Sequence, residues 1–225
     1  LHLFGKGLSS SPENFGSQGN SPSHPALLDW LAHQFIQEGG SRKKLIRKIV
    51  TSQTYRQSSR HRPELNAYDP DNSLLHRQNR KRVEAEIIRD LHLSVSGLLA
   101  HRIGGSSVFP PIPPDVAAQS FANNFQWKVS KGPDRYRRGM YTFFKRTAPA
   151  PNLMTFDCPD SNTSVTRRNI SNTPLMALTT LQNEVFHEAA QALARRIKSN
   201  SDLDTDHKRV DQLFLLSLSR RPSPS

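Results

Sequence analysis

The chain has 225 residues, of which 35% are hydrophobic, 31 are Lys or Arg and 19 are Asp or Glu, giving a formal net charge of +12. This length suits one substantial core or two small ones, and no apolar stretch reaches the roughly 18 residues that a bilayer-spanning helix needs. The single cysteine, Cys158, excludes an intrachain disulfide framework and a thiolate zinc site. Because the chain opens at Leu1 without an initiator Met or an apolar signal core, we expect a piece of a longer polypeptide.

Two helices are predicted in the first 50 residues. Pro25 suits a first helical turn, and apolar residues at helical spacing continue to Ile36, before Gly39–Gly40 offers a left-handed C-cap. Ser41 can cap a second helix, in which an apolar face is opposed by Arg and Lys residues. The pattern therefore predicts an αα-hairpin closed by two glycines.

A long helix is predicted from Ser73 to about Ser96, after the turn-forming residues Asp69–Asn72. Its polar side carries opposite charges four residues apart, as in the pair Arg82 and Glu86. The proline-rich segment that follows cannot be helical, so residues 104–115 are the best candidate for a boundary within the domain.

Three further helices are predicted. They cover Asp134–Thr147 with an aromatic face, Thr173 to about Ile197 with a leucine-rich stripe, and roughly Asp206–Ser219. No convincing alternating strand is present. The sequence therefore predicts a mainly α fold: an irregular domain of five or six helices with long Pro- and Gly-rich loops, spanning residues 1–222 with a tail at 223–225.

Catalytic and metal-binding motifs are absent from the sequence. The nine histidines form no His-x-x-x-His or His-Glu-x-x-His pattern, so we expect surface or packing histidines rather than metal ligands. No Cys-x-x-Cys-His is available for covalent haem attachment, so no cofactor is expected in this chain, although a histidine or Met140 could reach a c-type haem in a companion domain. Without a nucleophile elbow or a phosphate-binding glycine loop, the sequence leaves open whether the protein is an enzyme.

Arginines dominate three clusters that either face an anion or brace the fold. On the predicted helix through Glu86, opposite charges at helical spacing favour a structural network. After Asp134, interleaved aromatic and guanidinium groups suit either stacking on bases or sugars, or covering a core. A third cluster, just before a predicted helix start, suits a carboxylate, sulfate or phosphate. The candidate residues are Arg80, Arg82, Glu86, Arg89, Arg137, Arg138, Arg167 and Arg168. Nucleic-acid binding is suggested only by the net charge, and because basic residues are dispersed and no base-reading motif is present, it is the third and least favoured alternative.

Many segments of the chain, in order, resemble one family. They are Phe4–Leu8, Phe15–Gly16 with Gly19, His24–Leu31, Ile49–Ser52, Thr54–Ser58, Asp69–Asn72, Arg77–Arg80 continuing through Glu86, Ile88–Asp90, Arg137–Arg138, Tyr141–Phe143, Asn172–Leu175 and Ala177–Leu178. On these motifs the chain resembles the planctomycete-type domain of unknown function 1553 (DUF1553), also called PSD1, from Leu3 to Pro222. It has Ser164 and Met176 where cysteine and glutamine are common in that family.

The resemblance implies a setting rather than an activity. Members are typically the C-terminal part of large exported bacterial proteins, beside a second domain of unknown function and often a c-type cytochrome-like domain, and no catalytic residue is established for them. We therefore expect a non-catalytic helical module of an exported protein, periplasmic or extracellular, that docks on companion domains and binds an anionic polysaccharide or an electron-transfer partner. The alternative is a redox or glycan-processing enzyme module whose site is completed by a missing N-terminal domain.

Overall fold

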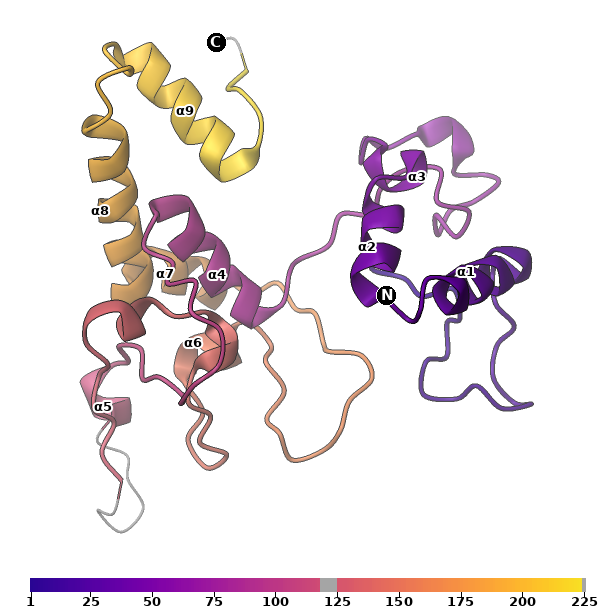
Figure 1. Cartoon of the computed structure of the whole chain (residues 1–225), viewed down its shortest axis with the longest axis horizontal. Coiled ribbons are helices and arrows are strands. Elements are labelled where there is room, and N and C mark those ends of the chain that lie inside the picture. The colour runs from indigo at the N-terminus through magenta and orange to yellow at the C-terminus, as the bar shows by residue number, and fades with distance from the viewer. Residues whose placement is uncertain (118–124, 224–225) are drawn as a thin grey trace. The chain divides into compact units, whose positions relative to one another are not determined.

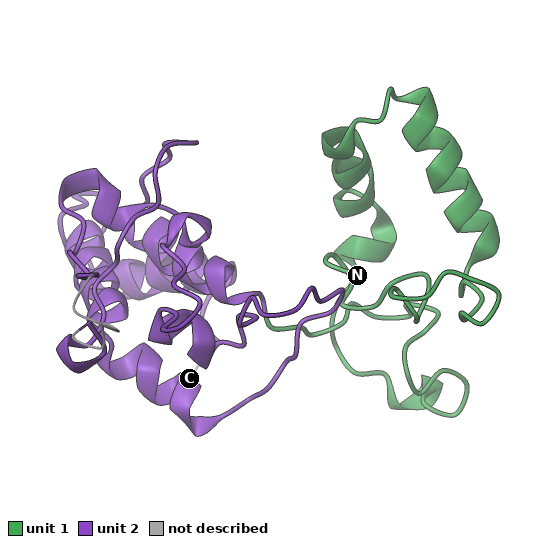
Figure 2. Cartoon of the chain, turned by 90° about the horizontal axis from the view of Figure 1, so that it is seen from below, with its two compact units in different colours: residues 1–82 green, residues 83–225 purple. Residues whose placement is uncertain are grey.

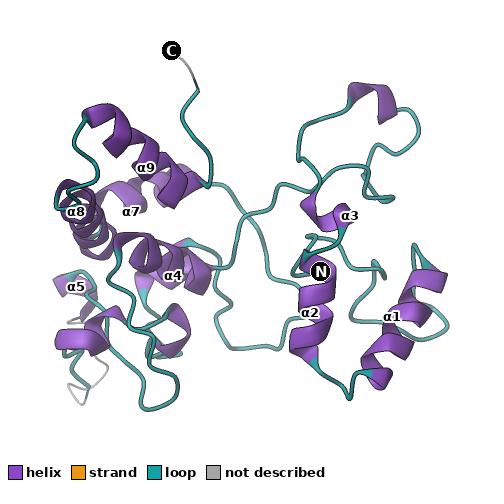
Figure 3. Cartoon of the chain, turned by 45° about the horizontal axis from the view of Figure 1, so that its top comes forward, coloured by secondary structure: helices purple, strands orange, loops and turns teal. Residues whose placement is uncertain are grey.

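Helices and irregular loops make up the part of the chain that the structure describes, residues 1–117 and 125–223. Within those residues this computed structural model contains nine α-helices and three short 3-10 turns, joined by the loops shown in Figure 3. The predicted mainly α class is confirmed, with more and shorter helices than the five or six expected. Residues 224–225 of the predicted tail lie outside the described residues.

The chain divides into two compact units, residues 1–82 and residues 83–225, which have separate colours in Figure 2. The proline-rich segment at 104–115 lies inside the second unit. There, the Pro110 carbonyl accepts a hydrogen bond from the indole nitrogen of Trp127 at 2.7 Å. The prolines thus form part of the packing of that unit.

The predicted hairpin forms in the first unit. Its helices are α1 (Pro25–Gln37) and α2 (Arg42–Val50), and the short α3 (Gln53–Arg56) follows. The Ser41 hydroxyl accepts a hydrogen bond from the Lys44 amide, as its N-cap position predicts. Gly39 and Gly40 both have left-handed backbones, with φ of 71° and 72°, which L side chains rarely adopt. Local cap and turn chemistry therefore sets the bounds of both helices.

The long helix predicted from Ser73 to Ser96 is wrong over its first half, because α4 begins only at Ala85. Asp69 uses its carboxylate to accept the amides of Ser73 and Leu74, at 2.7 and 2.9 Å. Asn72, with a left-handed φ of 51°, binds both the amide and the carbonyl of Arg77. The Asn72 bonds occupy the amide and the carbonyl of Arg77, which a helix would have paired internally, so the segment folds as an irregular turn instead.

The second unit is built around α4 (Ala85–Ser96) and α8 (Glu184–Lys198), which pack side by side (Figure 1). The remaining helices of this unit are α5 (Pro114–Ala117), α6 (Pro151–Thr155), α7 (Pro174–Gln182) and α9 (Asp206–Leu218). The core consists of buried side chains from four of these helices and the residues beside them: Ala85, Ile88, Ala150, Leu153, Phe156, Met176 and Phe186. The helix predicted over roughly Asp206–Ser219 is confirmed as α9, which ends one residue earlier.

The helix predicted over Asp134–Thr147 is wrong. Two 3-10 turns, Gly132–Tyr136 and Gly139–Tyr141, replace it, and isolated parallel bridges pair the segment with Ala100 and Val108. A side-chain carbon on Gly139 would lie 2.5 Å from the Glu86 carbonyl oxygen, so the backbone here packs directly against the start of α4. Long-range contact with α4 therefore overrides the local helical pattern.

The helix predicted from Thr173 to Ile197 is two helices, α7 and α8, separated at Asn183. The Asn183 side chain accepts a hydrogen bond from the Val185 amide and exchanges two amide hydrogen bonds with Asn152. Asn183 thus caps α8 and ties its start to α6, which explains why an uninterrupted apolar stripe does not give one helix.

Candidate functional site

Among the candidate arginines, Arg137 is fully buried, with an exposed fraction of 0%. Its guanidinium donates to the backbone carbonyls of Ser106, at 2.9 Å, and Gly104, and lies 3.8 Å from the centre of the Tyr141 ring. Carbonyl oxygens and an aromatic face therefore surround the charge. In this position Arg137 holds the loop at residues 102–106 against the 3-10 turns, and it is not available to an external anion.

Arg89, on α4, is also buried and binds carbonyls of the same segment. Its Nε donates to the Arg137 carbonyl at 3.2 Å, and its Nη2 donates to the Arg135 carbonyl at 2.8 Å. Burial lowers the pKa of Arg89 to about 10, although the neighbouring Asp90 carboxylate favours the charged form. The side chain remains protonated at neutral pH and acts as a fixed donor between α4 and residues 135–137.

Asp90 completes the attachment of α4 to this segment. Its carboxylate accepts the Arg138 Nε at 2.7 Å and the Gly139 amide at 2.6 Å. Both bonds are charge-assisted, and the Gly139 bond is buried. Consecutive residues of α4, Arg89 and Asp90, thus bind the same short stretch, one by donating and the other by accepting.

A second group of charges joins that stretch to α8. The Glu188 carboxylate accepts the Arg135 Nε at 3.0 Å and the Tyr136 hydroxyl at 2.7 Å, while Glu184 accepts the Arg135 Nη2 at 2.7 Å. The Glu184 and Glu188 contacts raise the pKa of Arg135 against the effect of its partial burial, which on its own would lower that pKa. Arg135 and Tyr136 belong to the predicted cluster of interleaved aromatic and guanidinium groups after Asp134, but sequence reasoning missed Glu188, because it lies about 50 residues away in the chain.

Glu86 and Arg168 form a separate pair. The Arg168 Nη1 and Nη2 donate to the two carboxylate oxygens at 2.6 and 3.1 Å, and Glu84 lies 4.0 Å from the same guanidinium. The Cys158 sulfur lies 3.7 Å from Glu86 Oε1. Burial and the Glu86 charge raise the pKa of Cys158 to about 11, so at neutral pH this sulfur is a thiol and not the nucleophilic thiolate.

The eight predicted residues are therefore placed in four ways. Arg89, Arg137 and Arg138 come together around α4, and Glu86 pairs with Arg168. Arg80 and Arg82 belong to the first unit, where Arg80 is exposed and Arg82 is half-buried. Arg167 is exposed and makes no ion pair within the described residues. Glu86, Arg89, Arg137, Arg138 and Arg168 are thus engaged in bonds that hold segments of the chain together.

The first unit contains a cluster of polar side chains that sequence reasoning missed. Asn72, 1% exposed, donates to the Asn79 side chain at 2.9 Å, and Asn79 donates in turn to the Phe4 carbonyl at 2.9 Å. Gln57 donates to the Leu75 carbonyl, and Gln78 donates to the Tyr55 carbonyl. These residues come from four of the segments that resemble the family, so the recurrence of short amide-containing motifs could have indicated a shared cluster.

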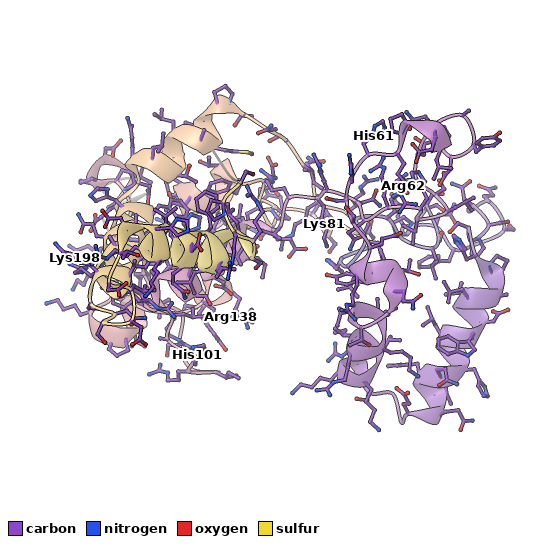
Figure 4. The ribbon with its side chains drawn as sticks, turned by 90° about the horizontal axis from the view of Figure 1, so that it is seen from above. His61, Arg62, Lys81, His101, Arg138 and Lys198 are labelled. Carbon is purple, nitrogen blue, oxygen red and sulfur yellow. The ribbon has the colours of Figure 1, made fainter. Side chains whose placement is uncertain are left out.

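A shallow, largely open depression with a basic lining, which we call the basic groove, lies at the C-terminal ends of α4 and α8. It measures about 890 Å³ and is lined by Ser96, Gly97, Leu98, Ala192, Arg195, Arg196, Lys198 and Ser199. Arg196 donates to the Val95 carbonyl at 2.7 Å, which satisfies one of the free carbonyls at the end of α4. Lys198 is at the end of α8 (Figure 4). Arg195 and Lys198 are exposed and make no ion pair in the part of the chain that the structure describes.

Within residues 1–117 and 125–223, no group of three His, Cys, Asp or Glu side chains could hold a metal ion. Over the same residues, none of the helices combines the length and the apolar character needed to cross a membrane.

Comparisons with known proteins identify a family without assigning an activity. No curated protein and no solved structure matches the chain. The family model described as "PSD1: Protein of unknown function (DUF1553)" matches residues 1–225, which confirms the resemblance drawn from the motifs. The chain therefore belongs to the PSD1 (DUF1553) family.

Proposed function

We propose that this chain is a non-catalytic docking module of a larger exported protein, and that it packs against companion domains through the leucine face of α7. We define the leucine face as Leu175, Leu178 and Leu181, all of which are exposed, with Leu181 reaching 75%. Residues three apart lie on neighbouring turns of a helix, so the three side chains follow one side of α7. Exposed leucines in such a row are typical of interaction surfaces.

The rest of α7 supports the same interpretation. The helix has no charged residue over its nine positions, and Met176 anchors it in the core from the other side. Solvated helices of soluble proteins usually carry charges on their outer face. Fully covering an exposed leucine side chain contributes roughly 1.5 to 3 kcal/mol. Because association itself costs at least about 4 kcal/mol, the three leucines form the apolar centre of a larger contact.

The test is binding between the full chain and the companion domains of the same polypeptide, expressed as separate chains. We expect Leu178→Glu combined with Leu181→Glu to weaken binding at least about tenfold, since a buried carboxylate replaces an apolar contact. Gln182→Glu adds a carboxylate to the same helix at an exposed position and serves as the matched control. Equal binding by wild type, double variant and control would contradict the proposal, provided that all three keep the same helix content and melting temperature.

The basic groove between α4 and α8 favours a second function, binding of an anionic polysaccharide or of an acidic electron-transfer partner. Two of its exposed cations, Arg195 and Lys198, make no ion pair with any residue that the structure describes. Arg195→Ala with Lys198→Ala should lower the salt concentration at which the chain elutes from heparin more than Arg220→Ala with Arg221→Ala, which removes the same charge elsewhere. Equal shifts would mean that only net charge is sensed.

A further inference from the structure

The loop between α6 and α7 contains two sequence motifs of the kind that accepts N-linked glycans. Residues 162–164 read Asn-Thr-Ser and residues 169–171 read Asn-Ile-Ser. The pattern Asn-x-Ser, with any residue but proline in the middle, is the acceptor motif for N-glycosylation in exported proteins. No other stretch of the 225 residues matches Asn-x-Ser or Asn-x-Thr. Both motifs therefore mark one loop, which Figure 1 shows in orange running out from the helices that it joins.

The first motif is open to solvent and is held only by local bonds. Every residue from 160 to 167 is exposed. The Asn162 side-chain amide and backbone amide donate to the two carboxylate oxygens of Asp160, at 2.7 and 3.0 Å. Asn162 makes no hydrogen bond to any other residue that the structure describes, and the Ser164 hydroxyl makes none within those residues. An enzyme could therefore bind residues 160–164 by opening a single local turn.

The second motif is fastened to the fold at both ends. The Ser171 hydroxyl donates to one Asp157 carboxylate oxygen at 2.9 Å, and the Ser171 amide donates to the other at 2.7 Å. The residue before Asn169 is Arg168, which is bound to Glu86. The acceptor motif requires a hydroxyl on its third residue. That hydroxyl is already engaged in the second motif and has no bond within the described residues in the first.

We propose that Asn162 carries an N-linked glycan and that Asn169 does not. The donor is an oligosaccharide attached to a polyprenyl diphosphate. In the transfer, a bond forms between the Asn162 Nδ2 and the first sugar carbon, while the bond from that carbon to the diphosphate oxygen breaks. The diphosphate leaves with the electron pair of the broken bond, and Nδ2 loses one proton to a base on the transferase. The step is a substitution without oxidation or reduction.

This inference rests on the proposed function in one respect, because glycans of this kind are added to exported chains. It also limits how the module docks. A glycan is bulky and solubilising, so residues 160–167 must stay in solvent in the assembled protein. Companion domains that cover the leucine face of α7 must therefore approach that helix without burying the loop that precedes it.

The first experiment analyses the polypeptide purified from the cells that make it. Trypsin cuts after Lys and Arg, so Asn162 falls in the peptide of residues 147–167 and Asn169 in the peptide of residues 169–195. Tandem mass spectrometry should find a glycan on the first peptide and none on the second. An exported polypeptide with unmodified Asn162 overturns this inference alone. A polypeptide that remains in the cytoplasm without a glycan overturns both the inference and the proposed export.

A second experiment tests the structural choice between the two motifs. The folded chain is incubated with a purified oligosaccharyltransferase that reads only the Asn-x-Ser/Thr motif, and with a polyprenyl-diphosphate oligosaccharide of known mass. We expect Asn162 to be modified at least about tenfold faster than Asn169, because the bonds between Ser171 and the Asp157 carboxylate must open first. Ser164→Ala should abolish modification of Asn162, whereas Ser171→Ala should leave it unchanged. Equal rates at the two asparagines would overturn the choice.

Release of the second motif provides the reverse test. Asp157→Ala frees the Ser171 hydroxyl and should raise the rate of modification at Asn169. Asp160→Ala removes a carboxylate from the same loop without touching Ser171, so it should leave the Asn169 rate unchanged and serves as the matched control. If Asn169 reacts equally slowly in wild type and Asp157→Ala, the bonds to Asp157 do not decide which motif is used, and that part of the inference is wrong.

Discussion

Both carboxylate oxygens of Glu86 are bound by the guanidinium of Arg168, 82 residues further along the chain. This pair fixes the second residue of α4 to the loop before α7. It also places a negative charge beside the Cys158 thiol. Stability, acid sensitivity and thiol reactivity are therefore linked through one side chain, and each can be measured separately.

Replacing Glu86 should destabilise the fold. Both partners are partly exposed, with 20% and 32% of their side-chain surface accessible, so solvent screens part of the attraction. We expect Glu86→Ala to lower the free energy of unfolding by about 1 to 2 kcal/mol, between the values of exposed and buried pairs. Glu13→Ala, at an exposed position in the opening loop, is the control. Urea unfolding of both variants checks the prediction, and equal, small losses would contradict it.

The same pair predicts a pH dependence. Burial raises the pKa of Glu86, but the hydrogen bonds and charge of Arg168 outweigh it, so the pKa in the folded chain lies below its ordinary value of 4.5. A carboxyl group whose pKa is lower in the folded chain stabilises the fold above its unfolded pKa, and loses this contribution as the pH falls through its folded pKa. The difference in unfolding free energy between wild type and Glu86→Gln should be constant above about pH 5.5 and shrink below pH 4.5. A difference that grows on acidification would be the opposite result.

The Cys158 thiol should react slowly. With a pKa of about 11, only a small fraction is thiolate at pH 8, and the thiolate is the form that attacks disulfide reagents. Modification of the native chain by an aromatic disulfide reagent should therefore be slower than modification of the urea-unfolded chain. Glu86→Gln removes a negative neighbour and should speed the native reaction, whereas Glu64→Gln, in the first unit, should not. If Cys158 is modified as fast in the native chain as in the unfolded chain, the prediction of a slowly reacting thiol is wrong.

Arg137 should be needed for stability. Its fully buried side chain donates to carbonyls of the exposed 102–106 loop, so removing it takes these donors away and leaves a cavity beneath the loop. We expect Arg137→Ala to cost at least about 2 kcal/mol of unfolding free energy. Arg137→Lys should recover little of this loss, because an ammonium lacks the planar fork that reaches several carbonyls and stacks on Tyr141. Arg146→Ala, at an exposed position, should change the unfolding free energy by less than about 0.5 kcal/mol in thermal or urea denaturation.

The sequence predicts correctly those helices whose ends are set by residues nearby in the chain, such as caps and turns. Ser41 caps α2, and Thr205 caps α9 by accepting the Lys208 amide. Prediction fails where distant partners decide the backbone, as when Gly139 must approach Glu86 closely. It fails again where Asn72 binds the Arg77 amide, which a continuous helix would have paired internally. For the same reason the charges of the candidate site could be found, but the pairing of Glu86 with Arg168 could not, because nothing local joins residues so far apart.

Neighbouring arginines should behave differently on a polyanion column. Arg168 is bound to Glu86, whereas Arg167 is exposed and forms no ion pair within the described residues. Arg167→Ala should lower the salt concentration for elution from heparin without changing the melting temperature. Arg168→Ala should lower the melting temperature and have the smaller effect on elution, because its charge is already neutralised. Since no base-reading element is present, random DNA should elute at a salt concentration similar to that for heparin, and both should shift together in Arg167→Ala. Equal elution shifts for the two variants would show that the arginine pair acts as a ligand site in its own right. A strong preference for one DNA sequence at physiological salt would contradict the expectation that heparin and random DNA bind alike.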